Sequence, residues 1–335
     1  MDIAVLPSHL VDQFGRTIDY LRVSITDRCD FRCVYCMSED MTFLPRAQIL
    51  SMEEIYAIVS AFVALGVKKV RITGGEPLVR KGAMELLAKL GKIPGLQDLV
   101  LTTNGSQLAT LAPALKAAGV KRINISLDTL DPEKFKSLTR TGDLATVLAG
   151  IAAAKMAGFE SIKLNAVILQ QRNHQEVVQL VKFAIQHALD ISFIEEMPLG
   201  VVTEHDRFES YYPSHLIRQD LSAHFTLLAS EHSSGGPSRY YSIAGTTTQV
   251  GFISPHSENF CSTCNRVRLT AEGRLLLCLG NEHAVDLKAV VRAHPGNSYS
   301  LKRAIVDAMQ LKPEKHEFNL QEQPIIFRHM NVTGG

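Results

Sequence analysis

The chain has 335 residues, which is enough for one large domain or two ordinary ones. With 46% hydrophobic and 21% charged residues, its composition excludes intrinsic disorder and fibrous repeats as descriptions of the whole chain. Its formal net charge is +1, so no overall field attracts it to nucleic acid or to an anionic membrane. The N-terminus lacks a basic region followed by an apolar one, and the most apolar stretch is broken by Lys155. We therefore expect a cytoplasmic protein with no nucleic-acid partner and no membrane partner.

Between residues 20 and 197, short β-branched runs alternate with longer helical patterns. This alternation predicts an α/β protein with βαβ units and a parallel sheet. The first helix begins after Ser51, where a Ser-Met-Glu-Glu sequence predicts a capping box. Six strands are expected, at residues 20–26, 68–73, 98–103, 122–127, 161–168 and 190–197.

One face of these strands is polar, although strands buried on both faces are normally apolar throughout. A closed eight-stranded barrel fills its interior with branched apolar side chains, so six strands with a polar inner face favour an incomplete (β/α)6 TIM-like barrel around a wet cavity. The alternative is an exposed edge or a register error, which recurrence in six strands disfavours. The polar face carries Arg22, Ser24, Thr26, Lys69, Arg71, Thr73, Thr102, Asn104, Asn124, Ser126, Asp128, Lys163, Asn165 and Glu195, with Met197 at its end.

The regular alternation stops after Gly200. We therefore predict a partial-barrel domain over residues 1–200 and a C-terminal domain over residues 201–335. The second part contains turn clusters and extended segments at residues 240–243, 249–253 and 266–270, with a late helix near residues 301–310.

The six cysteines form two groups of three, and neither group can pair internally without leaving an odd thiol. In a reducing cytosol, metal ligation or catalysis is the better interpretation. Three thiolates can hold three irons of a cubane cluster and leave the fourth iron open, whereas structural zinc needs four closed ligands. For the second group, zinc completed by His256 or His283 in a binding module remains an alternative. The groups are Cys29, Cys33, Cys36 and Cys261, Cys264, Cys278.

The first group has the spacing C-x3-C-x2-C, with Tyr35 before the last cysteine, and Gly74-Gly75-Glu76-Pro77 follows the second predicted strand. Together these motifs resemble the radical S-adenosylmethionine (SAM) superfamily. The resemblance implies a [4Fe–4S] cluster whose open iron binds SAM and, once reduced, cleaves it to a 5′-deoxyadenosyl radical. The cofactor would carry the hard chemistry, so no side chain is assigned as catalytic.

The second group, with Arg266-Val267-Arg268 after Cys264 and Gly334-Gly335 at the end, is similar to the GTP 3′,8-cyclase (molybdenum cofactor biosynthesis protein A) family. The likeness covers essentially the whole chain. Asp30 departs from the asparagine expected there, but that position is not a ligand. The resemblance implies a second [4Fe–4S] cluster on the C-terminal extension, whose open iron holds the guanine of GTP.

Residue roles follow from the same resemblance. It implies that SAM contacts Tyr35, Gly75, Ser126 and Met197. It implies that GTP contacts Arg22, Lys69, Arg71, Thr102, Lys163, Arg266, Val267 and Arg268. It also implies that the tail, Gly334 and Gly335, enters the active site.

The implied activity is that of a lyase that converts GTP to (8S)-3′,8-cyclo-7,8-dihydroguanosine 5′-triphosphate, the first step of molybdenum cofactor biosynthesis. In this reaction the adenosyl radical removes H3′ of the ribose, and C3′ then attacks C8 of the guanine. The implied partners are a reductant such as flavodoxin or ferredoxin, a downstream cyclic pyranopterin monophosphate synthase and a second copy in a homodimer. The alternative within the superfamily is a peptide modifier, for which more cysteines in the C-terminal extension are expected.

Overall fold

The computed structural model describes residues 6–202, 206–320 and 326–334. Its named strands form one twelve-stranded sheet in the order β12-β11-β10-β1-β2-β3-β4-β5-β6-β9-β8-β7. The six strands β1 to β6 lie in sequence order and pair in parallel, which confirms the α/β class. They are β1 (Tyr20–Ser24), β2 (Lys69–Thr73), β3 (Asp98–Thr103), β4 (Arg122–Ser126), β5 (Ser161–Ile168) and β6 (Asp190–Glu195).

The C-terminal part extends both edges of this sheet. Strand β10 (Arg266–Leu269) pairs in parallel with β1, and β9 (Gln249–Ile253) pairs in parallel with β6. The antiparallel strands beyond them are β11 (Arg274–Leu276), β12 (Ala284–Asp286), β8 (Arg239–Ile243) and β7 (Leu227–Ala229). The second cysteine group flanks β10 and β11, so the fold brings it next to the strand that precedes the first group.

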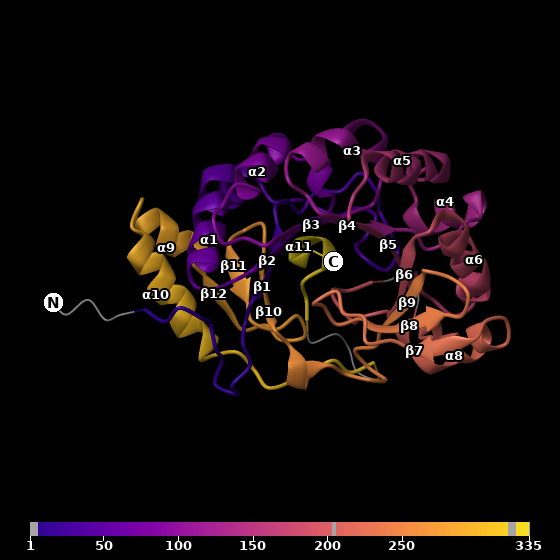
Figure 1. The fold of residues 1–335 in the computed structure, drawn as a ribbon. Coiled ribbons are helices and arrows are strands. Elements are labelled where there is room, and N and C mark those ends of the chain that lie inside the picture. Colours follow the sequence, from indigo (N-terminus) through magenta and orange to yellow (C-terminus); the bar gives the residue numbers. More distant parts are fainter. Residues whose placement is uncertain (1–5, 203–205, 321–325, 335) are drawn as a thin grey trace.

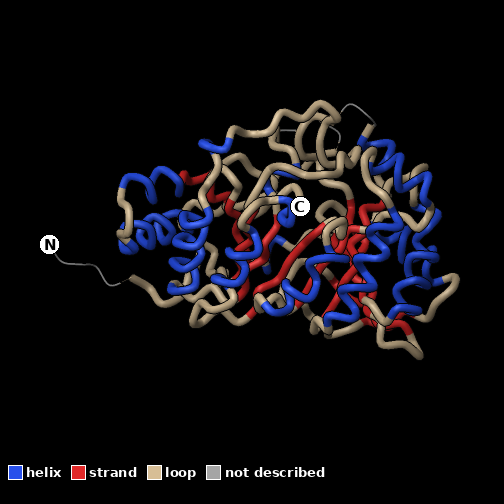
Figure 2. Tube along the Cα trace, turned by 90° about the horizontal axis from the view of Figure 1, so that it is seen from above, coloured by secondary structure: helices blue, strands red, loops and turns tan. Residues whose placement is uncertain are grey.

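Helices cover the outside of the parallel strands and form an arc around them in Figure 1, while the C-terminal helix lies inside the arc. Viewed from above in Figure 2, the strands run through the middle of the molecule. Helices α9 and α10 contact α1, and α8 contacts α6. The helices are α1 (Met52–Ala64), α2 (Ala83–Leu90), α3 (Leu108–Ala117), α4 (Pro132–Thr139), α5 (Leu144–Ala157), α6 (Val177–His187), α7 (Arg207–Ser210), α8 (Ser214–Ser222), α9 (Leu287–Ala293), α10 (Ser298–Met309) and α11 (Met330–Thr333), with short 3-10 turns at Arg46–Gln48, Pro77–Val79, His174–Glu176 and Cys261–Thr263.

Helix α1 shows how local sequence sets an element. The Ser51 hydroxyl accepts the backbone N–H of Glu54 at 3.1 Å, and the Glu54 carboxylate accepts the N–H of Ser51 at 2.7 Å, which confirms the predicted capping box. The stretch Arg46–Ala64 has the length and composition of a membrane span. However, the cap at Ser51 separates the 3-10 turn from α1, and α1 buries Ile58 and Phe62 in the core, as a core helix does.

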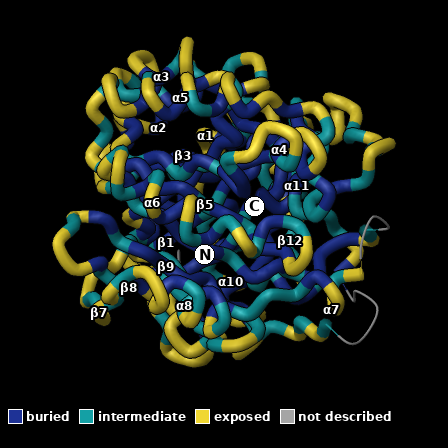
Figure 3. Tube along the Cα trace, turned by 90° about the vertical axis from the view of Figure 1, so that its right-hand side faces the viewer, coloured by how far each residue is buried: buried dark blue, intermediate teal, exposed yellow. Residues whose placement is uncertain are grey.

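The polar inner face predicted for the strands is confirmed. Lys69, Arg71 and Lys163 are only 8%, 6% and 8% exposed, although their side chains are charged. The opposite faces carry Val23, Ile72 and other apolar residues into the main hydrophobic core under the helices. Figure 3 shows this buried interior with exposed helix faces and loops around it. The buried charges on this strand face require hydrogen-bonding or oppositely charged partners on the inner side of the sheet, because burying an unpaired charge is unfavourable.

Candidate active site

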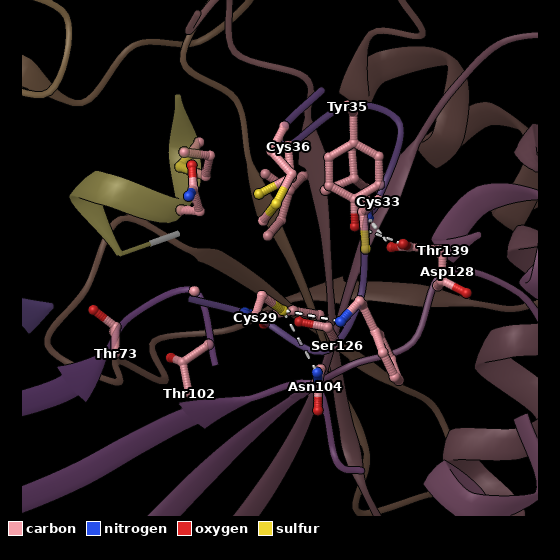
Figure 4. Close-up of a pocket in the computed structure, with 18 of the residues that line it drawn as sticks. Cys29, Cys33, Tyr35, Cys36, Thr73, Thr102, Asn104, Ser126, Asp128 and Thr139 are labelled. Atoms are coloured by element: carbon pink, nitrogen blue, oxygen red, sulfur yellow. Dashed lines mark hydrogen bonds between the residues drawn. The ribbon is translucent and has the colours of Figure 1, made fainter. Parts of the chain in front are cut away.

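A cavity of about 170 Å³ lies at the carboxyl ends of the parallel strands. The loop after β1 brings Cys29, Cys33 and Cys36 to it, and Figure 4 shows these cysteines around one space beside the strand ends. Its polar lining also includes Tyr35, Thr73, Gly74, Gly75, Thr102, Thr103, Asn104, Ser126, Asp128, Thr139, Asn165, Glu195, Glu196 and Asn331.

The Gly-Gly-Glu-Pro segment after β2 is hydrogen-bonded to the backbone that leads into the cysteine loop. Gly75 donates its N–H to the carbonyl of Thr26 at 2.7 Å, and Glu76 donates to the carbonyl of Arg28 at 2.8 Å. A Cβ at Gly75 would lie 2.3 Å from the Arg28 carbonyl oxygen, so the approach requires glycine. The backbone next to Cys29 is therefore held against the end of β2.

Glu76 is fully buried and connects this segment to β3. Its carboxylate accepts hydrogen bonds from Thr103 Oγ1 at 2.9 Å and from the backbone N–H of Asn104 at 2.7 Å. Burial raises the pKa of Glu76 to about 7, although these hydrogen bonds oppose the rise. Glu76 is thus a structural link of the loop.

The donor set fits an iron–sulfur cluster. The three cysteines are free thiols. Burial raises the pKa of each thiol, and no nearby cationic side chain offsets this rise. Thiolates in such surroundings require a bound cationic group, because burial disfavours an uncompensated negative charge. Among the described lining residues there is no histidine and no fourth cysteine, which leaves one position of a cubane free of a cysteine or histidine ligand.

The residues predicted to contact SAM, Tyr35, Gly75, Ser126 and Met197, all line this cavity. The Tyr35 hydroxyl donates to Asp128 Oδ2 at 2.6 Å, and Asp128 Oδ1 accepts the N–H of Val167 at 2.8 Å. Burial raises the pKa of Asp128 to about 6 against these bonds. Since Tyr35 lies between Cys33 and Cys36, the hydrogen bond to Asp128 joins the cysteine loop to the chain that follows β4.

The departure at Asp30 has a local role. Its carboxylate accepts hydrogen bonds from Asn104 Nδ2 and from Ser106 Oγ, both at 2.6 Å. Asn104 Nδ2 also lies 3.8 Å from Cys29 Sγ. Asp30 therefore ties the cysteine loop to the end of β3.

A second cavity, of about 80 Å³, contains the other cysteine group. Cys261, Cys264 and Cys278 line it together with Arg22, Arg266, Val267 and Arg268, and Met197 lines both cavities. The two cysteine groups thus face neighbouring spaces on one sheet.

Lys312 distinguishes the second group from the first. Its buried ammonium donates to the carbonyls of Leu277 at 2.6 Å and Arg266 at 3.2 Å, and to Cys264 Sγ at 3.6 Å. Burial raises the pKa of Cys264, but Arg266 and Lys312 outweigh burial and lower it overall. One sulfur of this group is therefore stabilised as a thiolate by the protein itself.

The zinc alternative is not supported. His256 and His283 do not line the second cavity, and His256 Nε2 is 2.9 Å from the Glu196 carbonyl. His316 lines this cavity instead, with Nε2 at 2.9 Å from the Pro255 carbonyl. The other ring nitrogen of His316, Nδ1, accepts the N–H of Phe318 at 3.3 Å, so both ring nitrogens have partners. The three thiols of this cavity therefore fit a cluster with an open iron.

Several cations are buried close together near the second cavity. Burial, followed by neighbouring cations, lowers the pKa of Arg22 to about 10, while Tyr20 opposes the shift. The pKa of Arg268 is lowered for the same reasons, and that of Lys69 falls to about 8, again mainly through burial. A set of buried cations that repel one another is electrostatically suited to a polyanion.

The structure does not bring all the predicted GTP contacts into one cavity. Thr102 lines the first cavity, and Lys69, Arg71 and Lys163 line neither of the two. Lys69 donates to the carbonyl of Ser234, and Lys163 Nζ donates to the Tyr240 hydroxyl at 2.8 Å. The segment between β7 and β8 thus provides the acceptor for Lys69, and Tyr240 on β8 provides the acceptor for Lys163.

The C-terminal tail lies between the two cavities. The Gly334 carbonyl accepts hydrogen bonds from Arg22 at 2.9 Å and from Arg268 at 3.3 Å. Asn331, on the preceding helix α11, lines the first cavity and donates to the carbonyl of Asp27 at 2.8 Å. Gly335 is outside the described residues.

Residues 23–184 match the family described as the Radical SAM superfamily, and residues 189–318 match the family described as Molybdenum Cofactor Synthesis C. The solved structure of Streptococcus suis SuiB bound to S-adenosylmethionine has a TM-score of 0.60 at 15% identity, over 96% of this chain and 79% of that chain, a likeness of fold alone. Fold and cysteine site together define a protein of the radical SAM class.

The more specific relationship comes from sequence identity. The chain is 63% identical to a GTP 3′,8-cyclase of Pseudomonas entomophila (strain L48), over 98% of this chain and 99% of that protein. It is 61% identical to a GTP 3′,8-cyclase of Pseudomonas putida (strain GB-1), over 97% of this chain and 98% of that protein. The chain belongs to the GTP 3′,8-cyclase family.

Proposed function

We propose that this protein is a radical SAM GTP 3′,8-cyclase that converts GTP to (8S)-3′,8-cyclo-7,8-dihydroguanosine 5′-triphosphate, the first step of molybdenum cofactor biosynthesis. The observation that carries the proposal is the arrangement of two three-cysteine cavities that share Met197, with buried cations beside them. The family membership supports the same activity.

In the first cavity, Cys29, Cys33 and Cys36 would hold a [4Fe–4S] cluster, with SAM next to it. When bound and reduced, this pair supplies a 5′-deoxyadenosyl radical. The chain's part is to hold the cofactor and to exclude water and competing hydrogen donors. We assign Tyr35, Gly75, Ser126 and Met197 to SAM binding, since they surround the same space as the thiols.

In the second cavity, Cys261, Cys264 and Cys278 would hold the other cluster and with it the guanine. The triphosphate needs charge-assisted hydrogen bonds, which guanidinium groups supply in a geometry that matches phosphate oxygens. We assign this role to Arg22, Lys69, Arg71, Lys163, Arg266 and Arg268. We assign further contacts with GTP to Thr102 and Val267, and the orientation of the substrate to the tail at Gly334. Such a substrate would place its ribose between the two cavities.

In this proposal the parallel strands act as an incomplete (β/α)6 barrel. Residues 1–200 provide the SAM site, and residues 201–335 provide the second cluster. We also propose a cytoplasmic location, a flavodoxin or ferredoxin as reductant, a cyclic pyranopterin monophosphate synthase that takes the product, and a homodimer.

Isotope transfer tests the reaction. GTP deuterated at C3′ is given to the anaerobically reconstituted, reduced protein with SAM, and mass spectrometry follows the deuterium. We expect one deuterium atom in 5′-deoxyadenosine and a cyclised product, and neither from a Cys33→Ser variant. Cleavage of SAM without deuterium transfer would remove GTP as the substrate and leave the radical chemistry in place.

A further inference from the structure

Tyr20 begins β1 and is buried within the cation cluster, although it is not among the predicted substrate contacts. Its hydroxyl oxygen accepts a hydrogen bond from Arg71 Nε at 2.7 Å. The ammonium of Lys69 lies 4.7 Å from the centre of its ring. In the described part of the chain, no group accepts a hydrogen bond from the Tyr20 hydroxyl. A neutral phenol at this position would bury an unsatisfied donor, whereas a phenolate has no proton to place.

The charges around Tyr20 are mostly positive. Lys69 and Arg266 are its direct neighbours in the sheet, on β2 and β10. Two acidic residues lie in this region. Asp19 precedes Tyr20 in the chain, and its carboxylate accepts a hydrogen bond from Asn265 at 2.8 Å. Asp98 on β3 lies 3.8 Å from Lys69 and is also paired with Arg122 on β4. Burial raises the pKa of Tyr20, but Arg71, Arg22, Lys69 and Arg266 together outweigh burial and lower it to about 6. The geometry and the charges therefore favour the same ionised form.

We propose that Tyr20 is a phenolate in the free protein, where it acts as an internal anion that positions Arg71 and its neighbours. When the triphosphate of the substrate binds, its charge replaces that of Tyr20, and Tyr20 takes up one proton from solvent, which its hydroxyl then donates in a hydrogen bond to a phosphate oxygen. The inference rests on the proposed function, because it assumes that the cation cluster binds a nucleoside triphosphate. It adds Tyr20 to that site as a positioning residue that makes binding depend on pH.

Linkage gives the expected size of the effect. Well above the pKa of about 6, proton uptake weakens binding by up to tenfold per pH unit, so by up to about 50-fold between pH 6, where half of Tyr20 is already protonated, and pH 8. Titration of the phosphates affects wild type and Tyr20→Phe alike, so the ratio of their affinities isolates the tyrosine. Lys69, whose pKa is about 8, also loses its charge at higher pH, so the affinities of the two proteins are compared only up to pH 8.

The test uses the anaerobically reconstituted full chain at about pH 8, with inorganic tripolyphosphate as the probe, because this anion does not absorb in the near ultraviolet. We expect a tyrosinate band in the free protein that disappears on saturation, with an amplitude of one tyrosine. Tyr20→Phe is expected to lack this change and to bind the probe more tightly than wild type, by a ratio that rises from pH 6 to pH 8. Tyr56→Phe, a change of an exposed tyrosine on α1, is the matched control and is expected to behave as wild type.

Other outcomes separate this inference from the proposed function. A band that is absent, or that is unchanged on saturation, overturns the role of Tyr20, as does an affinity ratio that is the same at every pH. If GTP is cyclised while the tyrosinate signal does not change, only the inference fails. If neither tripolyphosphate nor GTP binds the wild type, both fail.

Discussion

The closest backbone approach at the SAM site allows a prediction for Gly75→Ala. The added Cβ would lie 2.3 Å from the Arg28 carbonyl oxygen, about 1.1 Å short of the 3.4 Å at which ordinary contact begins. The clash is with backbone, so no side-chain rotation relieves it. Overpacking of this kind costs roughly 1–3 kcal/mol. At the upper end, about 3 kcal/mol reduces the population of the correctly closed cysteine loop by roughly two orders of magnitude.

The assay isolates the first cysteine site. In a background where Cys261, Cys264 and Cys278 are all serine, only Cys29, Cys33 and Cys36 remain to hold a cluster, so anaerobic reconstitution should give about four irons per chain. We expect Gly75→Ala in this background to retain well under one iron, with unchanged circular dichroism. Gly236→Ala is the control, because its Cβ would have a nearest contact of 3.7 Å. Full iron content and an unchanged cluster spectrum in Gly75→Ala would refute the reasoning.

Three further predictions concern the rest of the site. Lys312→Met removes the cation next to Cys264, so the midpoint potential of the second cluster, measured in a redox titration monitored by electron paramagnetic resonance, should fall by at least about 60 mV. Lys315→Met changes an exposed lysine and should leave this potential unchanged. Burial raises the pKa of Glu76 to about 7, so the folded protein favours the protonated carboxyl. The free energy of unfolding, measured in urea, should therefore fall by about 1 kcal/mol from pH 6 to pH 7. Glu76→Gln should remove this pH dependence. A slope that persists in Glu76→Gln would assign it to another group. Gly334 has a φ of +72°, and in Gly334→Ala the added Cβ would lie 1.9 Å from the hydroxyl oxygen of Thr73. We expect GTP-dependent turnover to fall about 100-fold while the iron content stays unchanged. Turnover equal to that of the wild type would contradict the role of the tail.

The order and faces of the parallel strands could be predicted from the sequence because both depend on local patterns. Alternation of polar and apolar residues identified the inner face that the structure buries at Arg71 and Lys163. The predicted first strand runs two residues too far, since the chain turns after Ser24 and the Thr26 carbonyl accepts the N–H of Gly75. How β9 and β10 join opposite edges of the sheet was not predictable, since pairing of distant strands leaves no mark on short stretches.

The cysteines of the candidate site were predictable because their spacing is local. Asn104 and Asp128 were visible on the polar strand face, but nothing in the sequence distinguished them from other polar residues there. Lys312 and Tyr20 carried no signal at all. Lys312 reaches Cys264 from 48 residues away, and Tyr20 acquires its surroundings only when β1 pairs with β2 and β10.

Production of 5′-deoxyadenosine tests the central claim most directly. The anaerobically reconstituted, dithionite-reduced protein receives SAM with each of the four ribonucleoside triphosphates in turn, or with none. The proposed function predicts strong stimulation by GTP alone. Cleavage that is equally fast with all four triphosphates and without them, from protein with both clusters intact, would contradict GTP as the substrate.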